Sequence, residues 1–183
     1  VMGEEDLFLS VERVRVSYVF HNRSAQDVTG EVIFPLPPVS VGGQLESAMN
    51  LPEDRAQENL VSFTASINGV PVTVTQDRIA VIEPPWDENR PAAAAYDTPG
   101  RDVTADLTRL GLPLTTDGPA AAQALLALDA AARAEVVALG LGDFYTYDGE
   151  SGPQTDAYPY WSIVLRYHWT QTFPAGAEVK VAH

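Results

Sequence analysis

Asn68-Gly69 lies between two runs of β-forming residues, Val61–Ile67 and Val70–Thr75. This dipeptide suits the positive φ angles of a type I′ turn, which joins two antiparallel strands with only two residues. It is the strongest local signal in the chain and predicts a β-hairpin at this position. A chain built around such a hairpin contains antiparallel sheet.

Other segments alternate apolar and polar residues with the period of two that a half-buried strand requires. Near the N-terminus, Val14–Phe20 and Val28–Phe34 predict a second hairpin, which ends at Pro35. Residues 158–170 predict a long central strand whose apolar face consists of Trp161, Ile163, Leu165, Tyr167 and Trp169. Residues 178–182 start a further strand without an evident partner, which predicts that the chain is the N-terminal part of a longer protein.

The apolar period changes between residues 103 and 141. Pro119 can open an alanine-rich helix, and Asp129 can cap a second helix that ends at Gly140. Residues 39–60 show no clear period and are expected to form a surface loop. We therefore predict a mainly β fold, an antiparallel β-sandwich that forms a single domain over residues 1–183, with a small α-helical insertion over about residues 103–141.

The charge balance excludes one class of partner. The chain has 25 acidic and 11 basic residues and a formal net charge of -14, so its field repels phosphate backbones. Nucleic acid is therefore not an expected partner. The absence of cysteine removes thiol nucleophiles and thiolate metal ligands. No run approaches the ~20 apolar residues of a membrane span, so we expect no transmembrane segment in this chain.

Several strand motifs carry a resemblance to a known family: Glu4–Ser10, Val14–Asn22, Phe34–Pro37 and Trp169–Gly176, with the end at His183. On these scaffold motifs the chain resembles the bacterial domain-of-unknown-function family numbered 4424. The resemblance implies a secreted or periplasmic protein that is made with a signal peptide, since removed, and that continues past the last residue. More distantly, the order of a strand, Asn22-Arg23-Ser24, a second strand and Phe34–Pro37 resembles the β-sandwich of vault and inter-alpha-trypsin-like domains. Neither resemblance implies an activity.

Aromatic residues, among them Tyr158, gather in and beside the predicted loops. Tyrosine and tryptophan are favoured at recognition surfaces because their rings combine a large apolar area with a polar group. The sequence therefore predicts a surface for a ligand or partner formed by Trp86, Tyr145, Tyr147, Tyr160 and Trp161. For Tyr160 and Trp161 an alternative stays open, namely that they are core or rim residues of the long strand.

Two further patterns concern metals. His21 and His168 project from the polar faces of their predicted strands and, if they meet in the sheet, can ligate zinc. Asp148 lies in a predicted glycine-containing loop with other acids that offer oxygen ligands to calcium, namely Asp143, Glu150 and Asp156. Neither pattern has the spacing of a known metal motif. The alternative is hydrogen-bonded strand histidines and a solvated acidic loop.

The predicted function is a non-enzymatic, extracytoplasmic binding or assembly module that engages a protein or an envelope-associated ligand. The sequence contains no Gly-x-Ser-x-Gly, no His-Glu-x-x-His and no cysteine nucleophile, which disfavours an enzyme. Two alternatives stay open: a metal-dependent or carboxylate-based periplasmic hydrolase, and a carrier of a small apolar ligand. The carrier requires an apolar cavity lined by Leu125, Leu128, Val136 and Trp161.

Overall fold

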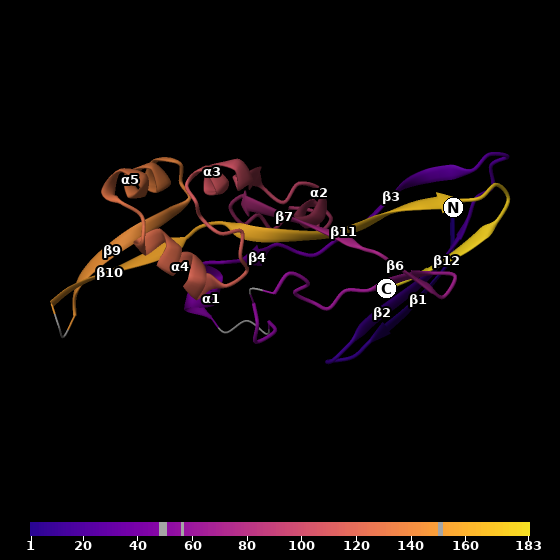
Figure 1. The fold of residues 1–183 in the computed structure, drawn as a ribbon, viewed down its shortest axis with the longest axis horizontal. Coiled ribbons are helices and arrows are strands. Elements are labelled where there is room, and N and C mark those ends of the chain that lie inside the picture. The colour runs from indigo at the N-terminus through magenta and orange to yellow at the C-terminus, as the bar shows by residue number, and fades with distance from the viewer. Residues whose placement is uncertain (48–50, 56, 150–151) are drawn as a thin grey trace. The chain divides into compact units, whose positions relative to one another are not determined.

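Antiparallel β-sheet makes up most of the regular structure. The computed structural model describes residues 1–47, 51–55, 57–149 and 152–183. One sheet has the strand order β1 (Met2–Leu9), β2 (Val14–His21), β12 (Glu178–Ala182), β5 (Ala65–Ile67) and β6 (Val70–Val72). A second has the order β3 (Val28–Pro35), β11 (Ser162–Phe173), β7 (Thr75–Ile82) and β8 (Arg101–Asp102), with β4 (Val39–Ser40) paired to β11. β9 (Gly142–Gly149) and β10 (Gly152–Pro159) form a separate hairpin (Figure 1). The predicted mainly β, sandwich-like class is confirmed.

The helices are short. They are α1 (Gly43–Glu46), α2 (Ala94–Asp97), α3 (Thr104–Arg109), α4 (Gly118–Leu126) and α5 (Ala130–Ala138). Among the residues that the structure describes, none of them is long and apolar enough to cross a membrane. The contacts divide the chain into two compact units: the first comprises Val1–Phe34, Val61–Gln76 and Arg166–His183, and the second Pro35–Leu60 and Asp77–Leu165.

The core of the first unit lies between its two sheets. Its buried residues are Ala65, Trp169, Val179 and Val181, and partly buried apolar side chains from β2, β3, β5, β6 and β11 pack around them. The strands around this core come from both sheets, so alternate residues of each sheet face a shared interior. This is the packing that the period-two pattern predicted.

The Asn68-Gly69 hairpin is confirmed. Both residues have positive φ angles, 51° and 81°, and β5 pairs with β6 across them, with Ile67 opposite Val70. The Asn68 side chain also accepts a hydrogen bond from the backbone N–H of Lys180 at 2.9 Å, which ties the turn to β12. β12 itself pairs with β2 on one side and β5 on the other, so the chain supplies the strand partners that the sequence left unassigned.

The predicted hairpin of residues 14–34 is wrong. β2 lies between β1 and β12, whereas β3 pairs with β11 in the other sheet. The chain changes sheet at Asn22, which is buried. Its side-chain amide donates to the carbonyl oxygens of Gln26 and Phe173, both at 2.8 Å. Alternation did not reveal this crossing, because a strand shows the same buried face with either partner.

The helical insertion lies where the change of period predicted it, since α3, α4 and α5 all fall between residues 103 and 141. Asp117 caps α4 by accepting from the Ala120 N–H at 3.1 Å, and Asp129 caps α5 by accepting from the Ala132 N–H at 2.8 Å. α5 is followed by Gly140 at a φ of 64°, a left-handed conformation that commonly ends helices.

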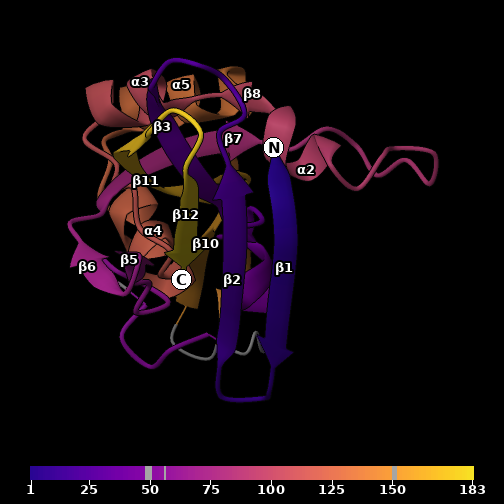
Figure 2. The ribbon, with the colours of Figure 1, turned by 90° about the vertical axis from the view of Figure 1, so that its right-hand side faces the viewer.

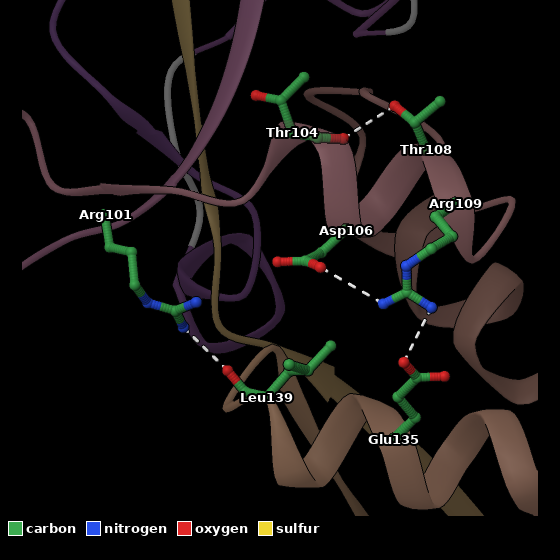
Figure 3. Close-up of polar contacts among 7 residues, drawn as sticks. All are labelled: Arg101, Thr104, Asp106, Thr108, Arg109, Glu135 and Leu139. Carbon is green, nitrogen blue, oxygen red and sulfur yellow. Dashed lines mark hydrogen bonds and ion pairs between the residues drawn. The ribbon is translucent and has the colours of Figure 1, made fainter.

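Two arginines join the helices of the insertion (Figure 3). Arg109 of α3 lies 3.3 Å from Asp106 of the same helix and 2.8 Å from Glu135 of α5. Arg101 of β8 donates to the carbonyl oxygen of Leu139 at 2.8 Å, at the C-terminal end of α5. The ion pairs are exposed to solvent, which screens them, so their contribution to stability is small. They fix orientation more than they add stability.

The segment expected as a surface loop, residues 39–60, contains regular and buried structure. It includes β4 and α1, and the side chains of Val41 and Leu60 are buried. Residues 48–50 and 56 of this segment lie outside the described residues. Neither element is long enough to show an apolar period in the sequence, because β4 has two residues and α1 has four.

Candidate binding groove

The β9–β10 hairpin positions the candidate site. The acidic segment expected as a calcium-binding loop forms two paired strands instead, with Tyr145 opposite Asp156 and Tyr158 opposite Asp143. Cross-strand partners share a face of a sheet, and so do alternate residues along each strand. These four side chains therefore lie on one face of the hairpin, whereas Asp148 lies on the other.

Helices α4 and α1 complete a groove over this face. α4 packs along β10 (Figure 1), and α1 comes close because two glycines permit it. A Cβ atom on Gly42 would lie 2.6 Å from the Tyr158 ring, and one on Gly118 would lie 2.6 Å from the Val41 carbonyl oxygen. The resulting hollow, here called the tyrosine groove, has a volume of about 470 Å³ and is lined by Leu45, Ala122, Gln123, Leu126, Tyr145, Asp156, Ala157 and Tyr158.

Hydrogen-bonded hydroxyl groups link Tyr160 to the groove. The Tyr160 hydroxyl hydrogen bonds with Tyr145 and donates to Oδ2 of Asp143 over a long 3.5 Å. The hydrogen bond with Tyr145, followed by burial, raises the pKa of Tyr160 to about 12. The ring centroids of Tyr158 and Tyr160 lie 5.8 Å apart. The three tyrosines therefore form one aromatic cluster.

Carboxylates and an amide hold the hydroxyl groups of Tyr158 and Tyr147 by hydrogen bonds. Burial raises the pKa of Tyr158 above its ordinary value, and a hydrogen bond with Glu46 of α1 raises it further. Tyr147 donates to Oε1 of Gln154 at 3.1 Å, and a hydrogen bond with Asp156 raises its pKa. Because neighbours fix the rings, a ligand that enters the groove loses little free energy in ordering them.

Replacing Tyr145 with phenylalanine is expected to lower the pKa of Tyr160. The hydrogen bond with Tyr145 is the main cause of the raised value, so Tyr160 in the unaltered chain stays neutral at a pH near 11, where an ordinary tyrosine with a pKa of about 10 is ionised. As the pH rises through about 12, Tyr160 ionises and its hydroxyl no longer donates. A ¹³C-tyrosine NMR titration, with Tyr160→Phe to assign the resonance, measures both values. Tyr147→Phe is the matched control and should leave the Tyr160 titration in place; equal shifts in both variants would contradict the hydroxyl network.

A family model matches the whole chain. The model of the domain of unknown function DUF4424 aligns with residues 1–183. The chain belongs to this family. Comparisons with curated proteins and with solved structures gave no significant match. The match confirms the family that the strand motifs indicated, and it assigns no activity, so the function of this DUF4424 chain has to be argued from its site.

The DUF4424 chain places the predicted aromatic residues in three settings. Tyr145 and Tyr147 lie on β9 and Tyr160 directly follows β10; their side chains are 52%, 45% and 43% exposed. Of these three, Tyr145 lines the tyrosine groove, Tyr160 hydrogen bonds with Tyr145, and Tyr147 hydrogen bonds with Asp156 of the groove lining. Trp86 is 85% exposed but lies in the segment after β7 and does not line the groove. Trp161 is fully buried, which matches the core alternative.

Sequence analysis placed Tyr158 among the aromatic residues near the loops but did not predict that it lines a groove, and it missed the helical wall. Tyr158 was assigned to one long strand over residues 158–170, but this strand is interrupted before Ser162, where the Tyr160 N–H donates to the carbonyl oxygen of Leu141 at 2.8 Å. The available signal was the alternation of Asp143, Tyr145 and Tyr147, which places all three on one face of a strand. The α4 wall left no comparable signal, because alanine-rich helices show little contrast between their faces.

The structure does not bring the candidate metal ligands His21, His168 and Asp148 together. His21, His168 and Asp148 lie on β2, β11 and β9, which belong to three different sheets. His168 pairs with Glu31 through Nδ1 at 2.5 Å, and His21 lines a smaller hollow of about 270 Å³. Glu150 of the calcium pattern lies outside the described residues. Within the described ranges, no group of three or more histidines and acids is placed to hold a metal ion.

The residues required by the carrier hypothesis do not form either hollow. Leu125, Val136 and Trp161 are fully buried, and neither they nor Leu128 line the tyrosine groove or the hollow at His21. Their apolar surface is covered by protein, as expected for packed core residues. The groove instead lies on the other face of α4, where Ala122, Gln123 and Leu126 are accessible.

Proposed function

We propose that this DUF4424 chain is a non-enzymatic binding module that acts outside the cytoplasm and holds a positively charged side chain of a protein partner in its tyrosine groove. The observation that carries the proposal is the composition of the groove. The rings of Tyr145 and Tyr158 share one hollow with the carboxylate of Asp156 and with an apolar wall. The extracytoplasmic setting rests on the family resemblance alone.

Electrostatics favours a cation in this groove. The face of an aromatic ring is negative, and a cation placed over it gains about 0.5–2 kcal/mol, with more in desolvated sites. Asp156 adds a formal negative charge within the groove, and the carboxylates of Asp143 and Glu46 hydrogen bond with the hydroxyl groups of Tyr160 and Tyr158. The net charge of -14 adds a long-range field that attracts a basic partner and speeds its encounter.

The size and the apolar wall fit one long basic side chain with its flanking backbone. A volume of about 470 Å³ falls in the range of roughly 300–1,000 Å³ that small-ligand sites occupy. Leu45 and Leu126 provide a surface for the aliphatic stem, since lysine and arginine bury their methylene groups while the charged end stays polar. The planar guanidinium of arginine can in addition stack on a tyrosine ring, so we expect arginine to bind more tightly than lysine.

The test uses N-acetyl-arginine amide as the probe and N-acetyl-citrulline amide as its uncharged match. In an NMR titration we expect the arginine probe to shift the resonances of Tyr145 and Tyr158, and the citrulline probe to bind at least about fivefold more weakly, a difference of roughly 1 kcal/mol. Tyr145→Ala should weaken arginine binding by a similar factor because it removes one ring and its cation–π contact.

Trp86→Ala is the matched control, because Trp86 is exposed and lies outside the groove. It should leave arginine binding unchanged. Equal affinity for the arginine and citrulline probes would overturn the charge selection, and shifts confined to residues away from the hairpin would overturn the groove as the site.

A further inference from the structure

β1 forms an open edge of the first sheet. In Figure 2 it lies on the outer side of β2, away from β12, and the strand order of the described residues gives it β2 as its pairing partner. The strand has eight residues, and every one of them is exposed. A long edge strand presents unpaired N–H and C=O groups to which another strand can bind.

Hydrogen bonds on the far side of β2 show which groups of β1 face outward. Val16 donates to and accepts from His183 of the C-terminal strand segment, at 2.8 and 3.0 Å, so its backbone groups point away from β1. Val16 is the partner of Leu7 in the β1–β2 register. Hydrogen-bonded and non-hydrogen-bonded pairs alternate in an antiparallel ladder. The N–H and C=O of Leu7 therefore point to the open edge, and so do those of Glu5 and Leu9.

Both faces of β1 carry apolar and acidic side chains. Leu7 and Leu9 share a face with their partners Val16 and Val14 and with Glu5, and the two leucines remain 53% and 65% exposed. Glu4, Asp6 and Phe8 lie on the other face. A strand added at this edge would cover the leucines with its own apolar residues and would place its alternate residues beside Glu4 and Asp6.

The acidic residues of β1 determine which kind of strand can pair with its open edge. If β1 paired with β1 of a second copy, Glu4, Glu5 and Asp6 of both chains would lie side by side, and like charges across a strand pair are destabilising. A partner strand with lysine or arginine at alternate positions instead finds opposite charges there. We propose that β1 accepts, by strand addition, an extended segment of a protein partner in which basic residues alternate with apolar ones.

The other edge strands of the two larger sheets are less suited to this role. β6 has three residues, one of them Pro71, and β8 has two. β3 is an eight-residue edge strand, but it contains Gly30 and ends at Pro35. Short strands, glycine and proline are the usual means by which edges are protected from pairing. β1 has none of these over Glu4–Leu9, where its charge selects rather than blocks.

The test measures binding of a fluorescent synthetic peptide of about eight residues that alternates lysine and valine, against the same peptide with glutamate in place of lysine. We expect the lysine peptide to bind at least about tenfold more tightly, and its affinity to fall with salt. Leu7→Pro should remove this binding while leaving the melting temperature within a few degrees, because proline is tolerated where the N–H faces away from the sheet.

Three further variants test whether the peptide binds by strand addition at β1. Leu7→Ala retains the backbone N–H and should bind within a few fold of the unaltered chain. Glu4→Lys combined with Asp6→Lys should reverse the preference in favour of the glutamate peptide. Tyr145→Ala, in the other unit, should have no effect, which separates this edge from the tyrosine groove. Undiminished binding to Leu7→Pro would overturn strand addition, and a concentration-dependent dimer that Leu7→Pro abolishes would identify a second copy as the occupant and overturn the basic partner.

Discussion

Replacement of Trp161 by alanine is expected to lower the free energy of unfolding by about 3–5 kcal/mol, the usual cost of truncating a buried tryptophan. The side chain is fully buried, and its backbone carbonyl accepts a hydrogen bond from the Val41 N–H at 3.1 Å. The residue thus anchors the start of β11 to the β4–α1 segment. Urea unfolding followed by circular dichroism measures the loss.

Trp161→Phe is the matched control for this prediction. The indole N–H of Trp161 is buried and has no hydrogen-bond partner within the described chain, so phenylalanine removes an unsatisfied donor while it keeps most of the ring. Its cost should be well below that of alanine. If both substitutions left stability unchanged but weakened partner binding, Trp161 would belong to the recognition surface that its position near the tyrosines suggested.

Local signals predicted the elements of this fold better than their partners. Asn68-Gly69 determined a hairpin because the turn geometry depends only on those two residues, and Asp129 marked a helix start because its cap is made within four residues. The pairing of β2 with β12 joins segments about 160 residues apart, and no local pattern specifies such a partner. The wrong hairpin over residues 14–34 has the same cause.

Part of the candidate site could be predicted from the sequence and part could not, for a related reason. Tyr145, Tyr147 and Tyr160 stand out in sequence because aromatic residues near acids and glycines are typical of recognition surfaces. Their joint placement depends on the register of β9 with β10, which puts Tyr158 opposite Asp143. The opposite wall depends on α4 and on a segment that has no period at all. A groove between elements far apart in sequence becomes visible only when the elements are packed.

Gly42→Ala is expected to damage both stability and the tyrosine groove. Gly42 has ordinary helical angles, φ −68° and ψ −38°, so alanine causes no backbone strain. Its Cβ, however, would lie 2.6 Å from the Tyr158 ring and would also meet the carbonyl oxygen of Pro159. Overpacking of this kind costs about 1–3 kcal/mol. Since the backbone carbonyl cannot move without β10, we expect Tyr158 to be displaced and the affinity for N-acetyl-arginine amide to fall with the stability.

Gly30→Ala separates this effect from a general response to glycine replacement. A Cβ on Gly30 meets nothing within 4 Å, and the residue lies in β3 of the first unit, so unfolding and probe binding should both stay close to those of the unaltered chain. Tyr145→Ala completes the comparison, because it should weaken binding with little loss of stability at a half-exposed position. If Gly42→Ala kept full stability and full affinity, α1 would not be in contact with Tyr158. The groove would then lack the wall that holds the aliphatic part of a basic side chain, and the proposed ligand would lose its main apolar contact.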